Sequence, residues 1–251
     1  VGASAGLSVT TGVQNTLVGG LAGDAITTAT DSTFVGYLAG SATTDGNHNT
    51  GIGSNALAAN TGGQNTAVGR DALAANTSAS FNTAVGRSAL SANTEGNRNV
   101  AVGKDAMRAN TLGSRNVAVG ESALDALNLT TATDSYNIGV GYFAGGSMTT
   151  GLNNTLIGGL AGDAITASND NVAVGTAALT TNTLSSENVA IGRSALQELN
   201  HTTATDGFNV AVGSDAGKLV TTGTNNTLIG GLAGDALTDA DLNVAVGDNA
   251  L

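Results

Sequence analysis

The sequence contains no cysteine, proline or tryptophan, and only 3% of its 251 residues are aromatic. Without cysteine the chain can form neither disulfides nor cysteine-ligated metal sites, and it carries no cysteine nucleophile. With so few large rings, small and β-branched side chains must fill whatever core exists. A hydrophobic content of 41% is nevertheless too high for a disordered chain. A thin core built from a repeated unit satisfies both observations.

Basic residues are also scarce, with 8 Lys and Arg against 19 Asp and Glu and a net charge of −11. Binding to nucleic acid or to an anionic membrane surface requires a basic patch, so this balance disfavours both. No apolar run approaches the roughly 18 residues that a membrane span requires. We therefore expect no nucleic-acid partner and no membrane span in this segment.

A short repeated motif, seen in Asn82-Thr83-Ala84-Val85-Gly86, organises the whole sequence. Its fourteen copies begin at Asn15, Ser32, Asn49, Asn65, Asn82, Asn99, Asn116, Asn137, Asn154, Asn171, Asn188, Asn209, Asn226 and Asn243. Successive copies start 17 residues apart in ten cases, 16 in one and 21 in two. Such a period is typical of proteins in which each repeat packs on the next.

We therefore predict an all-β fold, a parallel β-solenoid or β-roll of about 14 rungs with a 17-residue period. Residues 1–251 are interpreted as a single continuous array. Because Val1 and Leu251 fall in the middle of a rung, we expect an excerpt of a longer fibre. Below, each rung is numbered from its Asn or Ser as position one.

Positions two to four of each rung read as a strand. Position two is β-branched and position four is Val or Ile, whereas position three is mostly small, as in Thr83, Val85 and Ala84. Alternation along a strand places positions two and four on one face and position three on the other. We interpret the first face as buried, and the small face at Ala84 as the place where a partner chain approaches.

Positions five and eight are Gly and Ala in all fourteen rungs, as in Gly86 and Ala89. The invariant Gly predicts a corner with positive φ or crowded backbone, and the Ala predicts an inward point with no room for more. Most rungs with Gly at position nine carry Leu or Phe at position seven, whereas the other rungs carry Leu or Met at position nine. We interpret this exchange as one large side chain per rung filling one pocket from either position. An alternative makes residues 71–76 a single helical turn capped by Asp71.

Asparagine occupies position one in thirteen rungs, and a second Asn recurs at Asn60, Asn76, Asn93, Asn110 and Asn182. Stacked at the strand spacing of about 4.8 Å, identical Asn side chains can form hydrogen-bonded ladders. We interpret both columns as ladder and turn residues rather than as ligands.

Two rungs are extended by similar segments, residues 127–134 and 199–206. They lie 72 residues apart, so a four-rung block is duplicated on top of the basic repeat. Repeat proteins commonly place binding loops in such insertions, and we expect both to protrude on one side. Asn-x-Ser/Thr sequons occur at Asn76, Asn128, Asn153, Asn200 and Asn225, of which the two in the extensions, Asn128 and Asn200, are expected to be the most accessible.

The search for catalytic or metal-binding residues yields none. The two histidines, His48 and His201, lie in different kinds of segment, and His201 is expected to be a solvated loop residue. The pairs Arg70-Asp71 and Lys104-Asp105 resemble a solvated edge. The Gly-Gly-Leu-Ala-Gly-Asp segments ending at Asp24, Asp163 and Asp235 resemble calcium-binding β-roll repeats, but they recur in only three rungs. We predict no catalytic residue, no cofactor and no metal, and we do not expect an enzyme.

The rung Asn-Val-Ala-Val-Gly followed by x-x-Ala-x resembles the head repeats of trimeric autotransporter adhesins, and the repetitive arrays of some phage tail-fibre and bacterial surface-fibre proteins. The resemblance covers the whole chain, although the adhesin rung is shorter. It implies a β-roll that assembles as a side-by-side homotrimer, outside the cell or on a virion, and binds host surfaces, matrix or glycans.

The sequence is therefore expected to encode a structural and adhesive segment of an extracellular fibre, a non-catalytic rod that presents loops for surface attachment. A phage tail-fibre or receptor-binding fibre shaft is the first alternative. A calcium- or ligand-binding β-roll is the second. Ice binding, which needs an exposed flat Thr array, is disfavoured because Thr is replaced by Val or Ile in half the rungs and position two is expected to be buried.

Overall fold

The computed structural model describes residues 1–251 and is all-β, with short strands and no helix. The strands of the repeated motif are β1 (Thr16–Val18), β2 (Thr33–Val35), β3 (Thr50–Ile52), β4 (Thr66–Val68), β5 (Thr83–Val85), β6 (Val100–Val102), β8 (Val117–Val119), β10 (Ile138–Val140), β11 (Thr155–Ile157), β12 (Val172–Val174), β14 (Val189–Ile191), β16 (Val210–Val212), β17 (Thr227–Ile229) and β18 (Val244–Val246). Four two-residue strands lie outside the motif: β7 (Gly113–Ser114), β9 (Thr133–Asp134), β13 (Ser185–Ser186) and β15 (Thr205–Asp206).

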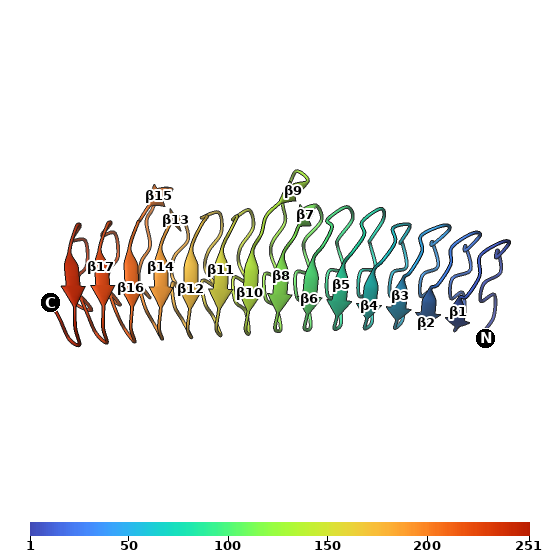
Figure 1. Ribbon diagram of the computed structural model, residues 1–251, viewed down its shortest axis with the longest axis horizontal. Coiled ribbons are helices and arrows are strands. Elements are labelled where there is room, and N and C mark those ends of the chain that lie inside the picture. Colours follow the sequence, from blue (N-terminus) through green and yellow to red (C-terminus); the bar gives the residue numbers. More distant parts are fainter. The chain divides into compact units, whose positions relative to one another are not determined.

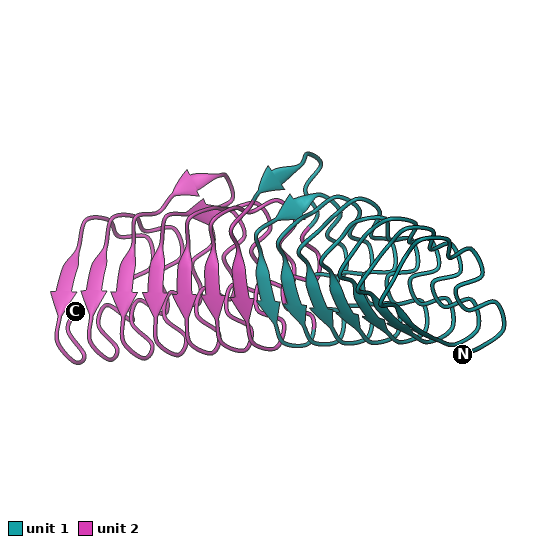
Figure 2. Cartoon of the chain, turned by 45° about the vertical axis from the view of Figure 1, so that its right-hand side comes forward, with its two compact units in different colours: residues 1–121, 128–134 teal, residues 122–127, 135–251 magenta.

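The chain forms two compact units (Figure 2): Val1–Glu121 with Asn128–Asp134, and Ser122–Leu127 with Ser135–Leu251. In the first unit β1 to β6 and β8 lie side by side in chain order, and in the second unit β10, β11, β12, β14, β16, β17 and β18 do the same (Figure 1). Every pair is parallel and in residue-for-residue register, so that Ala84 lies between Ala67 and Ala101. One strand per turn in this order is a parallel β-solenoid, which confirms the predicted fold class.

The orientation predicted for the strands is wrong. Position three points into the core, where Ala84 and Leu156 are fully buried, whereas positions two and four of each strand face outward and are partly exposed. Small residues dominate position three because the interior of a turn is narrow. Thr83 and Val85 therefore belong to the outer surface, and Ala84 cannot meet a partner chain.

Two ladders of buried asparagines run through the core, as predicted, except that Asn182 bonds only within its own turn. At position one the backbone N–H of Asn82 donates to Oδ1 of Asn65 at 3.0 Å, and that of Asn99 donates to Oδ1 of Asn82 at 2.9 Å. In the second column Nδ2 of Asn93 donates to Oδ1 of Asn76 at 2.9 Å. Both columns consist of almost fully buried side chains, so the repeated Asn satisfies polar groups that the narrow core could not otherwise bury.

The invariant Gly at position five forms the predicted corner. Gly86 has φ of 133°, and a Cβ there would lie 2.6 Å from the carbonyl carbon of Gly103 in the next turn. Both the conformation and the space therefore require Gly. Ala89, at position eight, is fully buried as predicted.

Residues other than Gly also adopt the left-handed conformation at positions seven and seventeen, and at position nine where it is Leu or Met. In one rung these are Ser88, Leu90 and Arg98, with φ of 57°, 50° and 57°. Non-Gly residues enter this region at a cost of about 1 kcal/mol or more, so the stacked turns must hold them there. Asp71 is one such residue, with φ of 60°, and this excludes the alternative of a helical turn over residues 71–76.

The predicted exchange between positions seven and nine is also wrong. Position seven is at least partly exposed in twelve of the fourteen rungs, with Leu160 at 36% and only Ser194 and Asp215 buried, whereas position nine is buried. The size of the residue at position nine instead depends on the residues at positions three and twelve. A Cβ on Gly162 would lie 2.8 Å from both Leu156 and Ile165. A large residue at position three also reaches the preceding turn, since a Cβ on Gly145 would lie 2.7 Å from Leu156. Neighbouring turns thus share one core, although not through the residues that were expected.

Candidate functional site

The most extensive candidate surface is the outward face of the strands, formed by the side chains at positions two and four, which we call the outer stripe. It consists of Thr, Val and Ile, and none of the motif strands carries a charged residue. Val18, Ile52 and Ile191 are 41%, 40% and 39% exposed. In β1 to β5 position two is Thr throughout, in register. The structure thereby contradicts the expected burial of position two.

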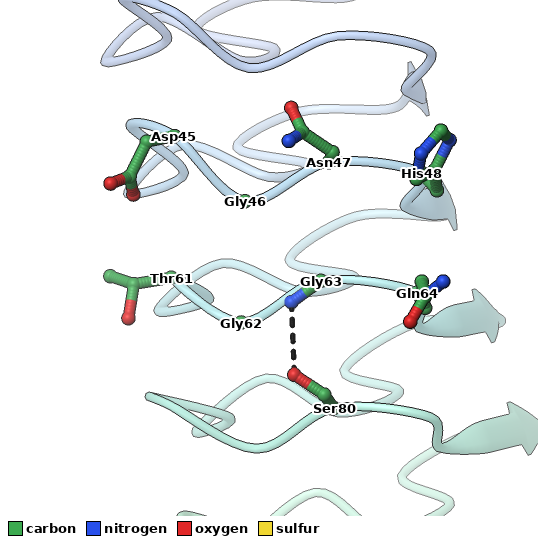
Figure 3. A pocket seen from close by; sticks show the side chains of 9 residues that line it. All are labelled: Asp45, Gly46, Asn47, His48, Thr61, Gly62, Gly63, Gln64 and Ser80. Carbon is green, nitrogen blue, oxygen red and sulfur yellow. Dashed lines mark hydrogen bonds between the residues drawn. The ribbon is translucent and has the colours of Figure 1, made fainter.

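A second candidate is a hollow in the first unit, with a volume of about 440 Å³ (Figure 3). It is lined by Asp45, Gly46, Asn47, His48, Thr61, Gly62, Gly63, Gln64 and Ser80. The hollow lies at the single 16-residue rung, Asn49–Gln64. That one irregular gap was its signal in the sequence, and sequence reasoning did not use it.

Several backbone donors at the short rung make no hydrogen bond to the next turn. In the turn before, the amides of Thr27, Thr28 and Ala29 all donate to the carbonyl of Thr44 at 3.0 to 3.2 Å. The corresponding amides of the next turn, including those of Asp45 and Gly46, make no such bond to Thr61, and those of Ser78 and Ala79 in a 17-residue rung likewise make none to Thr94.

A third column of polar contacts between turns is interrupted at the same place. At position sixteen side-chain oxygens accept from the amide of the preceding turn: Asn47 Oδ1 from Thr30 at 2.7 Å, and Ser80 Oγ from Gly63 at 3.1 Å. Gly63 has no side chain, so the amide of Asn47 lacks the equivalent acceptor. The hollow is therefore polar and has unused N–H groups on its wall.

The two extensions rise from their own turns (Figures 1 and 2) and are ordered by short strand pairs, β7 with β9 and β13 with β15. Asn128 and Asn200 are exposed, as expected, and each accepts a hydrogen bond from a Thr hydroxyl in the preceding turn. The expectation for His201 is wrong: it is 7% exposed, and its Nε2 lies 2.9 Å from the carbonyl oxygen of Thr222. Its position corresponds to Leu129 in the first extension, which is also 7% exposed, so the site is part of the interior.

The charged residues form short chains of ion pairs, the longest of which links Arg87, Asp105, Lys104 and Glu121. Lys104 lies 2.7 Å from Glu121, whose hydrogen bond and charge raise the pKa of the ammonium group. Arg70 lies 3.3 Å from Asp71 and Lys104 lies 3.6 Å from Asp105, as expected for ion pairs at the surface.

Asp215 contacts Arg193 and lies 3.4 Å from Lys218. Burial raises the pKa of Asp215, but the hydrogen bond from Ser214 and the two cations outweigh it and hold the pKa below its usual value.

The aspartates of the Gly-Gly-Leu-Ala-Gly-Asp segments do not gather into a metal site. No group of three or more His, Asp or Glu side chains in the structure could hold a metal ion. Asp24 and Asp163 each carry one buried carboxylate oxygen without a hydrogen-bond partner, and burial raises the pKa of Asp163. No helix is long and apolar enough to cross a membrane.

Comparison with known protein families, with characterised proteins and with solved structures finds no match to this chain. A proposal for the function of this chain therefore rests on its fold and its surface.

Proposed function

We propose that this chain is a structural and adhesive segment of an extracellular fibre, in which three copies pack side by side. The observation that carries the proposal is the outer stripe. In each unit a column of partly exposed Val and Ile side chains on the parallel sheet is costly to leave in water, and a second copy would bury it. Each turn offers a Val or Ile at position four beside a β-branched residue at position two, so the contact repeats with the rung.

The solenoid supports a structural role in a second way. Every turn makes its hydrogen bonds to the turns on either side of it, so the architecture can be lengthened by adding rungs. The narrow core of Ala and Asn leaves little room for an internal ligand. We therefore assign surface attachment to two features on the outside of the turns, namely the extensions and the hollow.

The mass of the particle in solution tests this proposal. Sedimentation velocity should give three times the chain mass of 24.2 kDa for the native protein. A Val85→Lys, Val102→Lys variant places two ammonium groups on the outer stripe and should sediment as a monomer. The control variant Thr28→Lys, Ser78→Lys adds the same charge at exposed loop positions and should remain a trimer. A native protein that is monomeric at micromolar concentration would overturn the proposal.

The same face supports a second candidate, ice binding, because the Thr column of β1 to β5 is exposed and in register. An ice-binding face must remain free of partner chains. Thermal hysteresis in a monomeric native protein, lost on replacing Thr50 and Thr66 with Lys, would favour this candidate over assembly. A trimer without thermal hysteresis would exclude it.

A further inference from the structure

We infer that the hollow at the short rung is a binding site for a neutral oligosaccharide. This inference names a ligand class for the adhesive part of the proposed function. It depends on the proposed function only for its biological setting. The site is built from three neighbouring turns and does not need a partner chain. Figure 3 shows its side chains along two of the turns, with Ser80 on the third beneath Gly63.

The first argument is the supply of unused hydrogen-bonding groups. The amides of Asp45, Gly46 and Asn47 have no protein acceptor. The Oγ of Ser80 accepts from Gly63, which leaves its O–H free to donate. Asp45 accepts from Thr44 through one carboxylate oxygen at 3.0 Å. The hollow therefore offers donors and acceptors at short intervals, as the hydroxyl groups of a sugar require.

The second argument is the charge and polarity of the wall. No Lys or Arg lines the hollow, and Asp45 does. His48 lies 3.9 Å from Asp31, which adds a further acidic group beside it. On a chain with a net charge of −11, this wall repels anions. No aliphatic side chain and no Phe, Tyr or Trp lines it either, so an apolar ligand would find little contact surface.

The third argument is an exposed aromatic ring beside the hollow. Phe81 follows Ser80 in the chain, its amide lies 3.4 Å from the carbonyl oxygen of Gly63, and it occupies the same column as His48 and Gln64. It is 49% exposed, with the guanidinium of Arg98 5.1 Å from the ring centroid. The face of the ring that Arg98 does not cover can pack against the C–H face of a sugar by dispersion contacts. One sugar would occupy the hollow and the next would lie against Phe81.

The position of the missing residue suggests a variant that lacks the site. Inserting one serine between Thr61 and Gly62 restores the 17-residue period. The insertion should return Thr61 to the place where its carbonyl accepts from the turn before, and should fill the hollow. The variant is expected to melt at or above the temperature of the native protein, so loss of binding cannot be attributed to unfolding.

Binding can be measured by saturation-transfer NMR and calorimetry with maltotriose, cellotriose, chitotriose and N-acetyllactosamine, and with 3′-sialyllactose as an anionic probe. At least one neutral sugar should bind, the serine insertion should abolish binding, and Phe81→Ala should weaken it about tenfold. The control Gln14→Ala, in the same column four turns from Phe81, should leave it unchanged. Retained binding in the insertion variant, preference for the sialylated sugar, or no binding of any neutral sugar at millimolar concentration would each overturn the inference. Because the trimer is tested separately by sedimentation, failure of either proposal can be recognised without the other.

Discussion

At the scale of single residues, the backbone of each turn depends on one Gly whose role can be isolated. Gly158 has φ of 135°, and a Cβ there would lie 2.5 Å from the carbonyl oxygen of Gly175. At the next residue, Gly159, φ is not positive and a Cβ would meet no atom within 4 Å. Of these two adjacent glycines, only Gly159 can therefore be replaced by a residue with a side chain without a clash.

We expect Gly158→Ala to lower the free energy of unfolding by about 3 to 5 kcal/mol, since it combines backbone strain with a clash against the next turn. Gly159→Ala should change it by less than about 0.5 kcal/mol. Urea denaturation of both variants measures the difference. Equal effects of the two substitutions would contradict the assignment of position five as a corner.

Two aspartates of the second unit should respond to pH in opposite directions. Burial raises the pKa of Asp163, so ionisation of its carboxyl group is a cost that is present above the raised pKa and absent below the unfolded value near 3.8. For Asp215, burial acts in the same sense, but Ser214 and the cations Arg193 and Lys218 outweigh it and lower the pKa. Its contribution is therefore present above the unfolded value and is lost as pH falls through the lowered pKa.

Asp163→Asn should accordingly stabilise the protein at pH 7, whereas Asp215→Asn should destabilise it. Both differences should shrink as the pH is lowered below about 4. Thermal melts of the native protein and the two variants at pH 7 and pH 3 provide the comparison. A stabilising effect of Asp215→Asn at pH 7 would show that its ion pairs do not support the fold.

At the scale of the rung, the exchange of core residues explains why turns with Gly at position nine occur in pairs. Leu156 extends toward position nine of its own turn, Gly162, and toward that of the preceding turn, Gly145. Both positions must therefore lack a side chain. The same arrangement recurs with Leu228 between Gly217 and Gly234. A turn of this type cannot stand alone among turns that carry Leu at position nine.

This arrangement predicts strong coupling between two core substitutions. Leu156→Ala leaves a cavity and should cost about 2 to 5 kcal/mol, and Gly162→Leu clashes with Leu156 and Ile165. The double variant should be about 1 to 3 kcal/mol more stable than the sum of the two single losses would give. The turn with Ala190 at position three buries both Leu196 and Leu199, which shows that this combination of residues packs. Additive losses in a double-mutant cycle would indicate that the two positions do not share space.

The sequence predicted the rung better than it predicted the direction of its side chains. The 17-residue period, the strand at positions two to four, the Gly corner and the Asn ladders all follow from residue types that must recur. The orientation of the strand does not, because alternation separates two faces without stating which is buried. Val85 suggested a core residue by its hydrophobicity, yet the narrow turn admits only Ala84. Similarly, the left-handed conformation of Ser88 and Arg98 carries no mark in their residue types.

The candidate site was less predictable because it arises from an irregularity. Gly63 has nothing distinctive as a residue type, and the hollow lies at the one rung that is a residue short. The orphaned amides of Asp45 and Asn47 become visible once neighbouring turns are compared in space. His201, which the sequence suggests to be solvated, is buried because the extension packs it where the first extension places Leu129.

At the scale of the whole molecule, surface charge and the outer stripe act on assembly in opposite directions. The net charge of −11 makes copies repel one another, whereas the uncharged stripe favours burial against a partner. Salt screens the repulsion, since the Debye length falls from about 30 Å at 0.01 M to about 8 Å at 0.15 M. Apolar contacts are not weakened in this way. The ion pairs on the turns, such as Lys104 with Glu121, involve half-exposed side chains and contribute little.

We therefore expect assembly to tighten as NaCl is raised from 0.01 to 0.3 M, with the dissociation constant falling at least several-fold in sedimentation equilibrium. The Val85→Lys, Val102→Lys variant should remain dissociated throughout this range, because added salt does not remove the cost of burying an ammonium group against an aliphatic face. If the native assembly instead dissociates with added salt, charged residues on the turns must form the contact. The outer stripe would then be free for another partner, and the side-by-side arrangement would have to be rebuilt around a different face.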